Sequence, residues 1–252
     1  MILETIDKYL EVHVKNTDYA IPITQVLEIV PSPTIRNVYT GSGKSQIVSV
    51  RGKIYPIIDL RLHFNHPSYR EELNELSSIL KQREQDHKNW LNELESSVRE
   101  EREFKLAKDP HKCKFGLWYD CFTTENKELN KLLPNFDEPH KKIHGIASTV
   151  IGYVENKDYQ SAYKLINQTK DSTLKQMIDL FSKTYTLLDE ANDQHLVIAQ
   201  NSKRDLGLLV DKAKNILSIN YDHVENLTST SQEQKVARLE DKIICIIDTD
   251  NF

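Results

Sequence analysis

Cysteine is scarce in this sequence: its 252 residues include only three. The first fourteen residues also lack the basic segment and the apolar block of a secretory signal, so we expect a cytoplasmic protein. An odd number of cysteines in a reducing compartment argues against a disulfide framework. Each cysteine is therefore expected to be a buried side chain, a metal ligand or a reactive thiol.

Long apolar runs and an excess of positive charge are lacking too. The longest apolar runs, such as residues 243–247, fall far short of the roughly 20 residues that a membrane-spanning helix needs, so we expect no membrane insertion. The 33 basic and 38 acidic side chains give a formal net charge of −5. Binding to a phosphate backbone needs clustered positive charge, so we expect no nucleic acid partner. With 38% hydrophobic and 28% charged residues, the chain can fill a core.

The hydrophobic pattern changes character twice along the chain. Within residues 9–62, short runs such as Tyr9–Val14 alternate between apolar and polar side chains, which is the period of a half-buried strand. From about residue 68, apolar residues recur at steps of three, four and seven, which predicts one face of a helix. The strands expected within residues 9–62 are residues 9–14, 19–22, 26–30, 47–50 and 54–60. Strand-like runs return at residues 195–200, 206–210, 216–219, 236–239 and 243–248.

The middle of the chain is predicted to hold four helical segments joined by short links, a pattern that favours an antiparallel bundle. The segments are a long helix ending before Pro110, a short helix near residues 113–119, one carrying His140 to Val154 and one carrying Ala162 to Leu188. Strands left alone in the first flank would have unpaired edges. We therefore expect residues 1–66 and 193–252 to form one β-domain, interrupted by the bundle at residues 67–192.

Residues 87–144 contain both tryptophans, two of the three cysteines and four of the nine histidines. His140 and His144 are four residues apart on a predicted helix and so share a face, while His87 lies on the apolar stripe of the first long helix. Cys113 lies near a predicted helix start, where partial positive charge favours a thiolate. Three imidazoles and one thiolate would complete a tetrahedral zinc site. From spacing alone, hydrogen-bonded core histidines and a small buried cysteine are an equally open interpretation.

Three segments in this region resemble the bacterial chemoreceptor zinc-binding (CZB) domain. They are a His before a Trp in Asp86–Leu94, a Cys-x-Phe-Gly-x-Trp pattern in Cys113–Tyr119 and a His-x-x-x-His helix in His140–His144. The resemblance covers roughly residues 70–190. It implies that zinc is bound by His87, Cys113, His140 and His144. His111 and Cys121 lie nearby but outside the motif, so we rank them below Cys113 as ligands.

The flanks resemble CheW, the scaffold that joins chemoreceptors to the histidine kinase CheA. The resemblance rests on residues 48–61 in the first flank and on Leu208–Asp211, Ile216–Ile219 and Ile243–Asp248 in the second. It implies a pair of small SH3-like β-barrels, here interrupted by the helical bundle. It also implies that Arg51 contacts partners, namely the cytoplasmic tip of a chemoreceptor and a CheA-type kinase. The family usually has Gly and Asn where this chain has Gln46 and Ser49.

Taken together, the two resemblances imply a chemotaxis adaptor whose zinc–Cys113 pair responds to oxidants such as hypochlorous acid, or to zinc itself. One alternative is a constitutive scaffold in which zinc is purely structural. A zinc-dependent hydrolase is a weaker alternative, because four protein ligands close the site and no Glu follows His140 as in the HExxH enzymes. We therefore expect no enzyme activity. Exposed faces of the bundle would allow two copies of the chain to form a homodimer.

Overall fold

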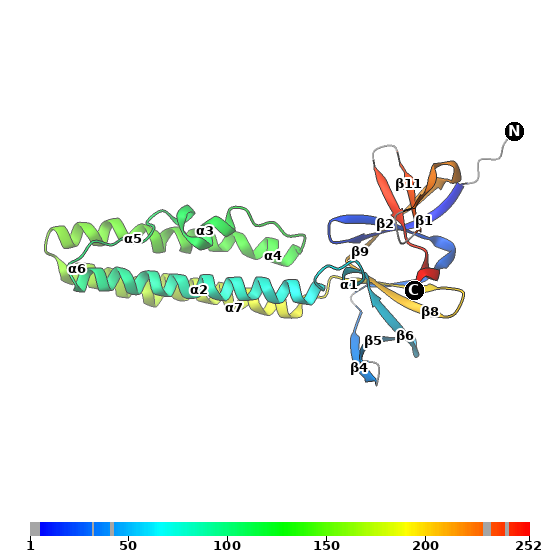
Figure 1. The fold of residues 1–252 in the computed structure, drawn as a ribbon. Coiled ribbons are helices and arrows are strands. Elements are labelled where there is room, and N and C mark those ends of the chain that lie inside the picture. The colour runs from blue at the N-terminus through cyan, green and yellow to red at the C-terminus, as the bar shows by residue number, and fades with distance from the viewer. Residues whose placement is uncertain (1–5, 32, 41–42, 229–232, 240–241) are drawn as a thin grey trace. The chain divides into compact units, whose positions relative to one another are not determined.

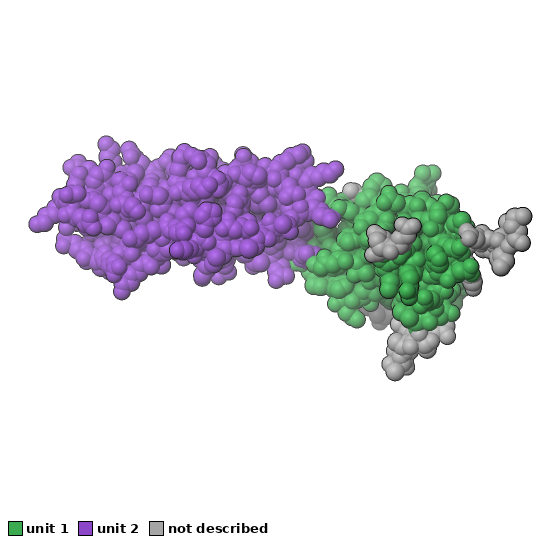
Figure 2. Space-filling view, turned by 90° about the horizontal axis from the view of Figure 1, so that it is seen from above, with its two compact units in different colours: residues 1–71, 192–252 green, residues 72–191 purple. Residues whose placement is uncertain are grey.

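The computed structural model describes all residues except 1–5, 32, 41–42, 229–232 and 240–241 (Figure 1). The chain divides into two compact units, coloured separately in Figure 2. Residues 1–71 and 192–252 form a β unit, and residues 72–191 form a helical unit. The fold class is therefore the predicted one, a β-domain that is interrupted by an inserted helical bundle.

One sheet of the β unit has six strands in the order β10-β11-β12-β2-β1-β9. These strands are β1 (Ile6–Val14), β2 (Thr17–Pro22), β9 (Lys212–Asn220), β10 (Val224–Thr228), β11 (Glu233–Arg238) and β12 (Ile243–Ile246). Leu10, Val12 and Val14, the alternate apolar residues of β1, share one buried cluster, but β1 is not half-buried as predicted, because Tyr9 and Glu11 on its other face are buried as well. β1 also pairs with β9, so this sheet joins the two flanks of the chain.

The second sheet also has six strands, in the order β3-β7-β8-β6-β5-β4. These strands are β3 (Val26–Pro31), β4 (Ile35–Thr40), β5 (Gly43–Val50), β6 (Lys53–Asp59), β7 (His195–Gln200) and β8 (Asp205–Val210). β6 pairs in parallel with β8, and Ile58 lies opposite Leu208. The last strand before the insertion is therefore a neighbour of a strand that follows it.

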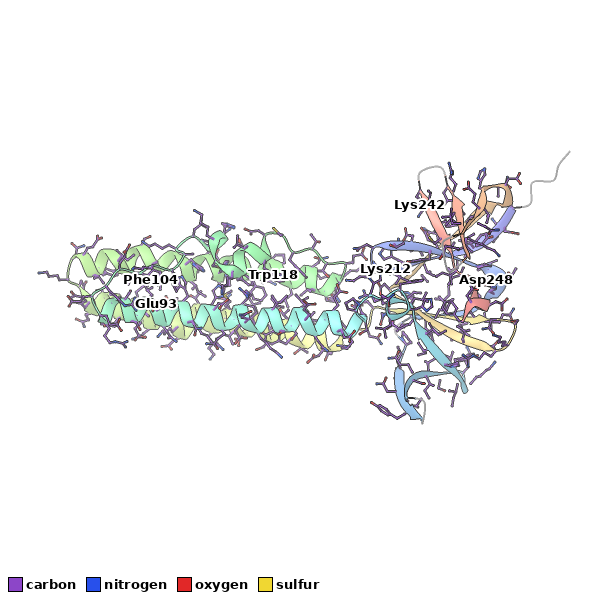
Figure 3. The ribbon with its side chains drawn as sticks, in the orientation of Figure 1. Glu93, Phe104, Trp118, Lys212, Lys242 and Asp248 are labelled. Atoms are coloured by element: carbon purple, nitrogen blue, oxygen red, sulfur yellow. The ribbon has the colours of Figure 1, made fainter. Side chains whose placement is uncertain are left out.

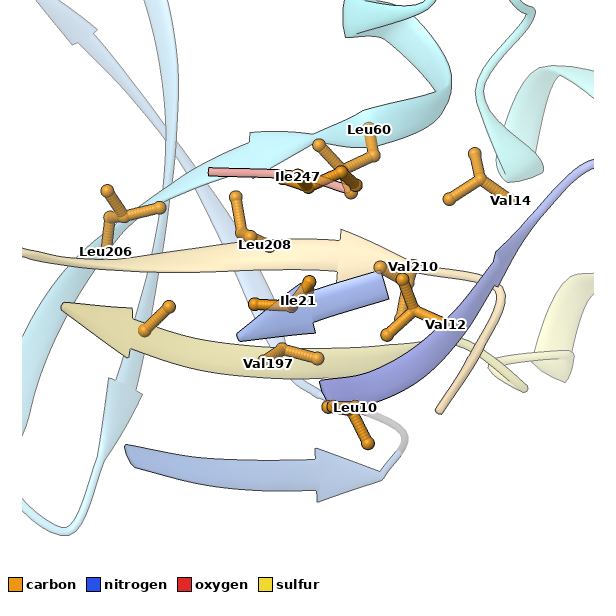
Figure 4. Packing of buried hydrophobic residues seen from close by; sticks show 11 residues of the cluster. Leu10, Val12, Val14, Ile21, Leu60, Val197, Leu206, Leu208, Val210 and Ile247 are labelled. Carbon is orange, nitrogen blue, oxygen red and sulfur yellow. The ribbon is translucent and has the colours of Figure 1, made fainter. Parts of the chain in front are cut away.

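Residues from both flanks fill the core of the β unit (Figure 4). The cluster consists of Leu10, Val12, Val14, Ile21, Leu60, Val197, Ala199, Leu206, Leu208, Val210 and Ile247. Each of these side chains is at most 5% exposed. Burial of one such side chain contributes about 1.5–3 kcal/mol. Because the cluster contains residues from both flanks, neither flank can form this core alone.

The helical unit contains three long stretches of helix and two short helices. They are α2 (Tyr69–Arg99), α3 (Lys114–Tyr119), α4 (Lys127–Leu132), α5 (Asp137–Glu155) and α6 (Tyr159–Thr169), which continues through a π-helical turn (Lys170–Leu174) into α7 (Lys175–Glu190). This unit also contains 3-10 turns at Pro110–Lys112 and Leu133–Phe136, whereas the short helix α1 (Leu60–His63) belongs to the β unit. Among the described residues, no helix has the length and apolar character to cross a membrane.

Both ends of the insertion are fixed by hydrogen bonds within the β unit. The Asp59 carboxylate caps α1 by accepting from the backbone N–H of Arg61 at 2.9 Å. The Arg61 guanidinium, 5% exposed, donates to Asp211 at 2.6 Å. The Tyr69 hydroxyl, at the first residue of α2, donates to Asp193 at 3.2 Å, and Asp193 follows the last helix. The chain therefore leaves and re-enters the β unit at points that are joined to each other.

Candidate metal centre

His87 comes from the buried face of α2 and is 3% exposed. Its Nδ1–H donates to the carbonyl oxygen of Arg83, one helical turn earlier, at 2.7 Å. This bond fixes the proton on Nδ1 and leaves the lone pair on Nε2 free to bind a cation. The buried Nε2 has no hydrogen-bond partner among the described residues.

His140 and His144 lie one turn apart on α5 and are 4% and 1% exposed. The Nδ1–H of His144 donates to the carbonyl oxygen of Ala107 at 3.0 Å, and its Nε2, like that of His87, has no partner in the described part of the chain. The Nε2 of His140 lies 3.2 Å from the Sγ of Cys113. Two of the three histidines thus present an unpartnered, buried nitrogen, and the third contacts the thiol.

Cys113 is the N-cap residue of α3 and is half-buried. Its Sγ accepts the backbone N–H of Gly116 at 3.2 Å. Gly116 is buried against the preceding 3-10 turn, where a Cβ atom would overlap the carbonyl oxygen of Pro110. The glycine of the Cys-x-Phe-Gly pattern therefore permits a close approach of two backbones, and this approach positions the sulfur.

The structure brings the donor atoms of His87, Cys113, His140 and His144 within 4.8 Å of one another. Ligand atoms of a tetrahedral zinc ion are separated by about 3.3–3.8 Å, so small side-chain movements would suffice to bind the ion. Buried polar atoms without partners are costly in a folded protein. The two orphaned imidazole nitrogens therefore fit a metal ion, and the nitrogen and sulfur donors match the preference of zinc.

Burial lowers the pKa of all three histidines, because the charged imidazolium loses its hydration. Burial and the charge repulsion of neighbouring imidazoles together lower the pKa to about 3 for His140 and about 4 for His144. All three rings are consequently neutral near pH 7, the state that binds a metal.

The thiol of Cys113 differs from the sequence-based expectation. Burial raises its pKa, and the N–H groups of Gly116 and Phe115 only partly oppose this effect. The expected stabilisation of a thiolate by the helix start is outweighed because α3 has only six residues and the sulfur is half-buried. A bound cation would provide the missing stabilisation.

Aromatic residues pack around the candidate ligands. The Nε1–H of Trp90 donates to the same Ala107 carbonyl that accepts from His144, at 2.8 Å, so one oxygen orients a ligand and fixes the loop before α3. The ring of Phe104, labelled in Figure 3, packs edge-on against Trp90 with 5.0 Å between centroids. Phe115 packs edge-on against the rings of both His87 and His140. Sequence reasoning included Trp90 and Phe115 only as motif letters and missed Ala107.

The lower-ranked alternatives lie outside this cluster. The Nδ1 of His111 pairs with the Asp120 carboxylate at 2.9 Å on the exposed surface, and Cys121 is exposed. Neither belongs to the group of converging donors.

Arg51 occupies a separate position, in the tight turn between β5 and β6. Its φ is 50° and that of Gly52 is 81°, and both values are typical of the two central residues of a type I′ hairpin turn. The Arg51 side chain is 83% exposed, and its guanidinium lies 2.9 Å from the Glu28 carboxylate. The turn therefore displays the arginine at the surface of the β unit.

Two family models match parts of the chain, and the first match extends into α2. Residues 8–87 match the CheW-like domain, and residues 87–151 match the chemoreceptor zinc-binding domain. No curated protein matches the chain significantly. A solved structure, the scaffolding protein TtCheW from Thermoanaerobacter tengcongensis, is similar with 13% identity and a TM-score of 0.43, over 97% of this chain and 90% of that one. Two parts of the chain are therefore similar to known families, residues 8–87 to the CheW-like domain and residues 87–151 to the chemoreceptor zinc-binding domain.

Proposed function

We propose that this chain is a cytoplasmic chemotaxis adaptor. Its CheW-like β unit would couple chemoreceptors to a CheA-type histidine kinase, and its helical unit would be a zinc-dependent sensor of oxidants. The observation that carries the sensor is the convergence of three buried imidazoles and one thiol within 4.8 Å. The two family matches support the adaptor.

In this proposal, His87, Cys113, His140 and His144 hold the ion, and the sulfur is the reactive ligand. A bound zinc ion supplies positive charge that keeps Cys113 a thiolate at neutral pH. The three imidazoles are at most 4% exposed, whereas Cys113 is half-buried, so the sulfur is the ligand that oxidants attack. Four protein donors leave no open coordination position, so we expect sensing rather than catalysis.

Oxidation of the sulfur would change how α3 is held. A sulfenic acid is a weaker ligand than a thiolate, so its formation would loosen the connection of α3 to α2 and α5. Movement of the helices would reach the β unit through the chain itself, and also through the hydrogen bond that the Tyr69 hydroxyl, at the start of α2, donates to Asp193 at the other end of the insertion. A ligand change of this kind is a local event that can bias a two-state element.

A kinase-coupling assay tests this proposal. Receptor-containing membranes, the kinase and this protein are combined with and without limiting hypochlorous acid, and phosphorylation is measured. We expect the oxidant to change kinase output with the wild-type chain and to have no effect with Cys113→Ser. If the wild type supports kinase coupling but its output ignores the oxidant, the constitutive-scaffold alternative holds instead.

The exposed Arg51 provides a separate test of the adaptor surface. Arg51→Ala should weaken receptor or kinase binding in pull-down measurements. The matched control is Arg238→Ala, because Arg238 is also exposed and ion-paired, with Glu225 at 3.4 Å, but lies in the other sheet. Equal binding by both variants would remove Arg51 from the proposed interface. The pairing of two copies through the bundle stays a prediction, which mass photometry can check.

A further inference from the structure

A cavity of about 280 Å³ lies beside the candidate metal centre. Its walls come from α2, from the loop that precedes the turn at Pro110–Lys112, and from the start of α3. His87, Cys113 and His144 line the cavity, so it reaches three of the four residues whose donor atoms converge. A small molecule in this cavity would therefore lie next to donor atoms that are otherwise largely buried.

Two lysines give the cavity an excess of positive charge. Lys112 and Lys114 both line it and are both exposed, so neither charge is lost by burial. The Lys112 ammonium lies 3.8 Å from the Asp109 carboxylate, and an exposed ion pair at such a distance is weak. Lys114 has no ion-pair partner in the part of the chain that the structure describes. Both ammonium groups can therefore pair with an anion that enters from solvent.

Asp86 is the acidic residue among those that line the cavity, and its charge is already balanced. Its carboxylate lies 3.1 Å from the guanidinium group of Arg83, one helical turn earlier on α2. The charges of Lys112 and Lys114 are therefore not offset by the other lining residues. A free divalent cation that enters along this route would meet repulsion, whereas an anion would be attracted.

The size of the cavity restricts the anion that can enter. A cavity of about 150 Å³ is enough for benzene, and pockets for drug-sized ligands occupy about 300–1,000 Å³. The space beside Cys113 lies between these values. It suits a compact molecule of about ten heavy atoms and excludes a folded partner or a nucleic acid strand. Trp90, Leu106 and Phe115 add apolar surface, against which the methylene groups between two acidic groups can pack.

We propose that this cavity binds small anionic chelators, which are compact molecules with two or three carboxylate groups, and that they carry zinc to and from the metal centre. The inference rests on the proposed function, because it takes the four converging residues as the zinc site, and it adds the class of ligand that sets the metal content. Lys112 and Lys114 attract the anion, and its carboxylates then lie beside the three ligands that line the cavity. During the exchange, carboxylate oxygens replace the nitrogen and sulfur donors of the ion, the thiolate takes up a proton from water and no oxidation state changes.

The first test measures the loss of zinc from the full, zinc-loaded wild-type chain. Nitrilotriacetate is the anionic probe, and 1,10-phenanthroline is an uncharged chelator of similar size. At each time point the protein is separated from the chelator on a desalting column, and its zinc content is measured by elemental analysis.

We expect the rate of zinc loss to rise in proportion to the nitrilotriacetate concentration, because the chelator enters the cavity before the ion leaves. Added salt should slow the loss to nitrilotriacetate and leave the loss to phenanthroline unchanged, because salt screens the attraction by the lysines. A rate that is independent of the nitrilotriacetate concentration, or the same salt dependence with both chelators, would overturn the inference.

The second test compares two double variants that remove the same charge. Lys112→Gln with Lys114→Gln changes the cavity, whereas the control, Lys164→Gln with Lys183→Gln, changes exposed residues of α6 and α7 that do not line it. We expect the first variant to lose zinc to nitrilotriacetate about tenfold more slowly than the wild type, because both attractive charges are gone, and to phenanthroline at the wild-type rate. The control should match the wild type with both chelators.

Equal rates with nitrilotriacetate in the two double variants, at equal initial zinc content, refute the anion site alone. The same slowing with both chelators also refutes it, since the lysines would then shape the cavity and not select charge. A purified wild-type chain that binds no zinc refutes the metal centre itself, and with it the proposed function.

Discussion

Replacing Gly116 with alanine should displace Cys113 from the metal centre. A Cβ atom at this position would overlap the carbonyl oxygen of Pro110, and would lie 2.9 Å from its carbonyl carbon and 3.0 Å from the Cα of His111. All three are backbone atoms, so no side chain can rotate away. The turn has to move, and it carries Cys113 directly, because the Cys113 N–H donates to that same Pro110 carbonyl.

The size of the effect follows from the cost of forcing atoms into packed structure. Overpacking costs about 1–3 kcal/mol. Part of this strain would be relieved by a displacement of the Cys113 sulfur, because the Gly116 N–H also donates to Sγ. Disturbing the groups that orient metal ligands weakens metal affinity by about 10- to 100-fold, and we expect Gly116→Ala to fall in this range.

The assay is a zinc competition titration against a chelator of known affinity, with thermal unfolding measured on the same samples. Gly145→Ala is the matched control, because Gly145 follows His144 on α5 and an added Cβ meets nothing within 4 Å. Alanine inside a helix should stabilise it by about 0.5–1 kcal/mol and leave zinc affinity unchanged. Wild-type zinc affinity in Gly116→Ala would refute the view that this backbone contact positions the sulfur.

Three further predictions concern the support of the ligands and the stability of each unit. Trp90→Phe removes one of two donors to the Ala107 carbonyl and should weaken zinc binding about tenfold in the same titration; an unchanged affinity would contradict the role of this carbonyl. Removal of zinc by a chelator should lower the melting temperature of the helical unit, because metal binding contributes to its folding, and leave the sheets' circular dichroism unchanged. Burial favours a raised pKa for Asp18, but hydrogen bonds from Lys214 and Lys242 hold it well below its ordinary value of 3.8. The ionised Asp18 therefore stabilises the fold above about pH 4, and this stabilisation is lost as the pH falls further. Asp18→Asn should lower the free energy of unfolding by about 1 kcal/mol at pH 7, and denaturant unfolding at a series of pH values should show a weaker loss of stability on the acid side.

Strands with a buried face were predictable from the sequence, and the two that were missed are both sheet edges. β1, β2, β7 and β8 alternate or are continuously apolar because they pack against the core. β4 and β10 pair on one side only, and they expose large side chains, with Tyr39 79% and Leu227 51% accessible. A strand that buries little leaves little periodic signal.

The last predicted helix contains a π-helical turn that its residue types do not indicate. α6 and α7 are joined by the π-helical turn at Lys170–Leu174, so the buried positions step by five, from Thr169 to Leu174, instead of three or four. All residues of the turn are compatible with an ordinary helix, and only the spacing reveals the extra residue. The short α4 was also missed, because its start depends on the Asn126 side chain, which accepts from the Leu129 N–H at 2.8 Å.

The candidate ligands could be named because the motifs around them resemble a zinc-binding family, whereas their spacing alone left core histidines and a buried cysteine equally open. Their orientation could not, since the carbonyl groups of Arg83 and Ala107 hold His87 and His144. Every residue has a carbonyl group, so a backbone acceptor has no signature in the sequence.

The parallel pairing of β6 with β8 has a consequence for biosynthesis. During translation, β6 leaves the ribosome well over a hundred residues before its partner, because β6 ends at Asp59 and β8 begins at Asp205. The helical unit, complete by residue 191, emerges in full while β6 still lacks β8 and β1 still lacks β9. A nascent chain can therefore acquire its metal before the sheets close, and the availability of zinc at that moment would influence how much of the protein matures.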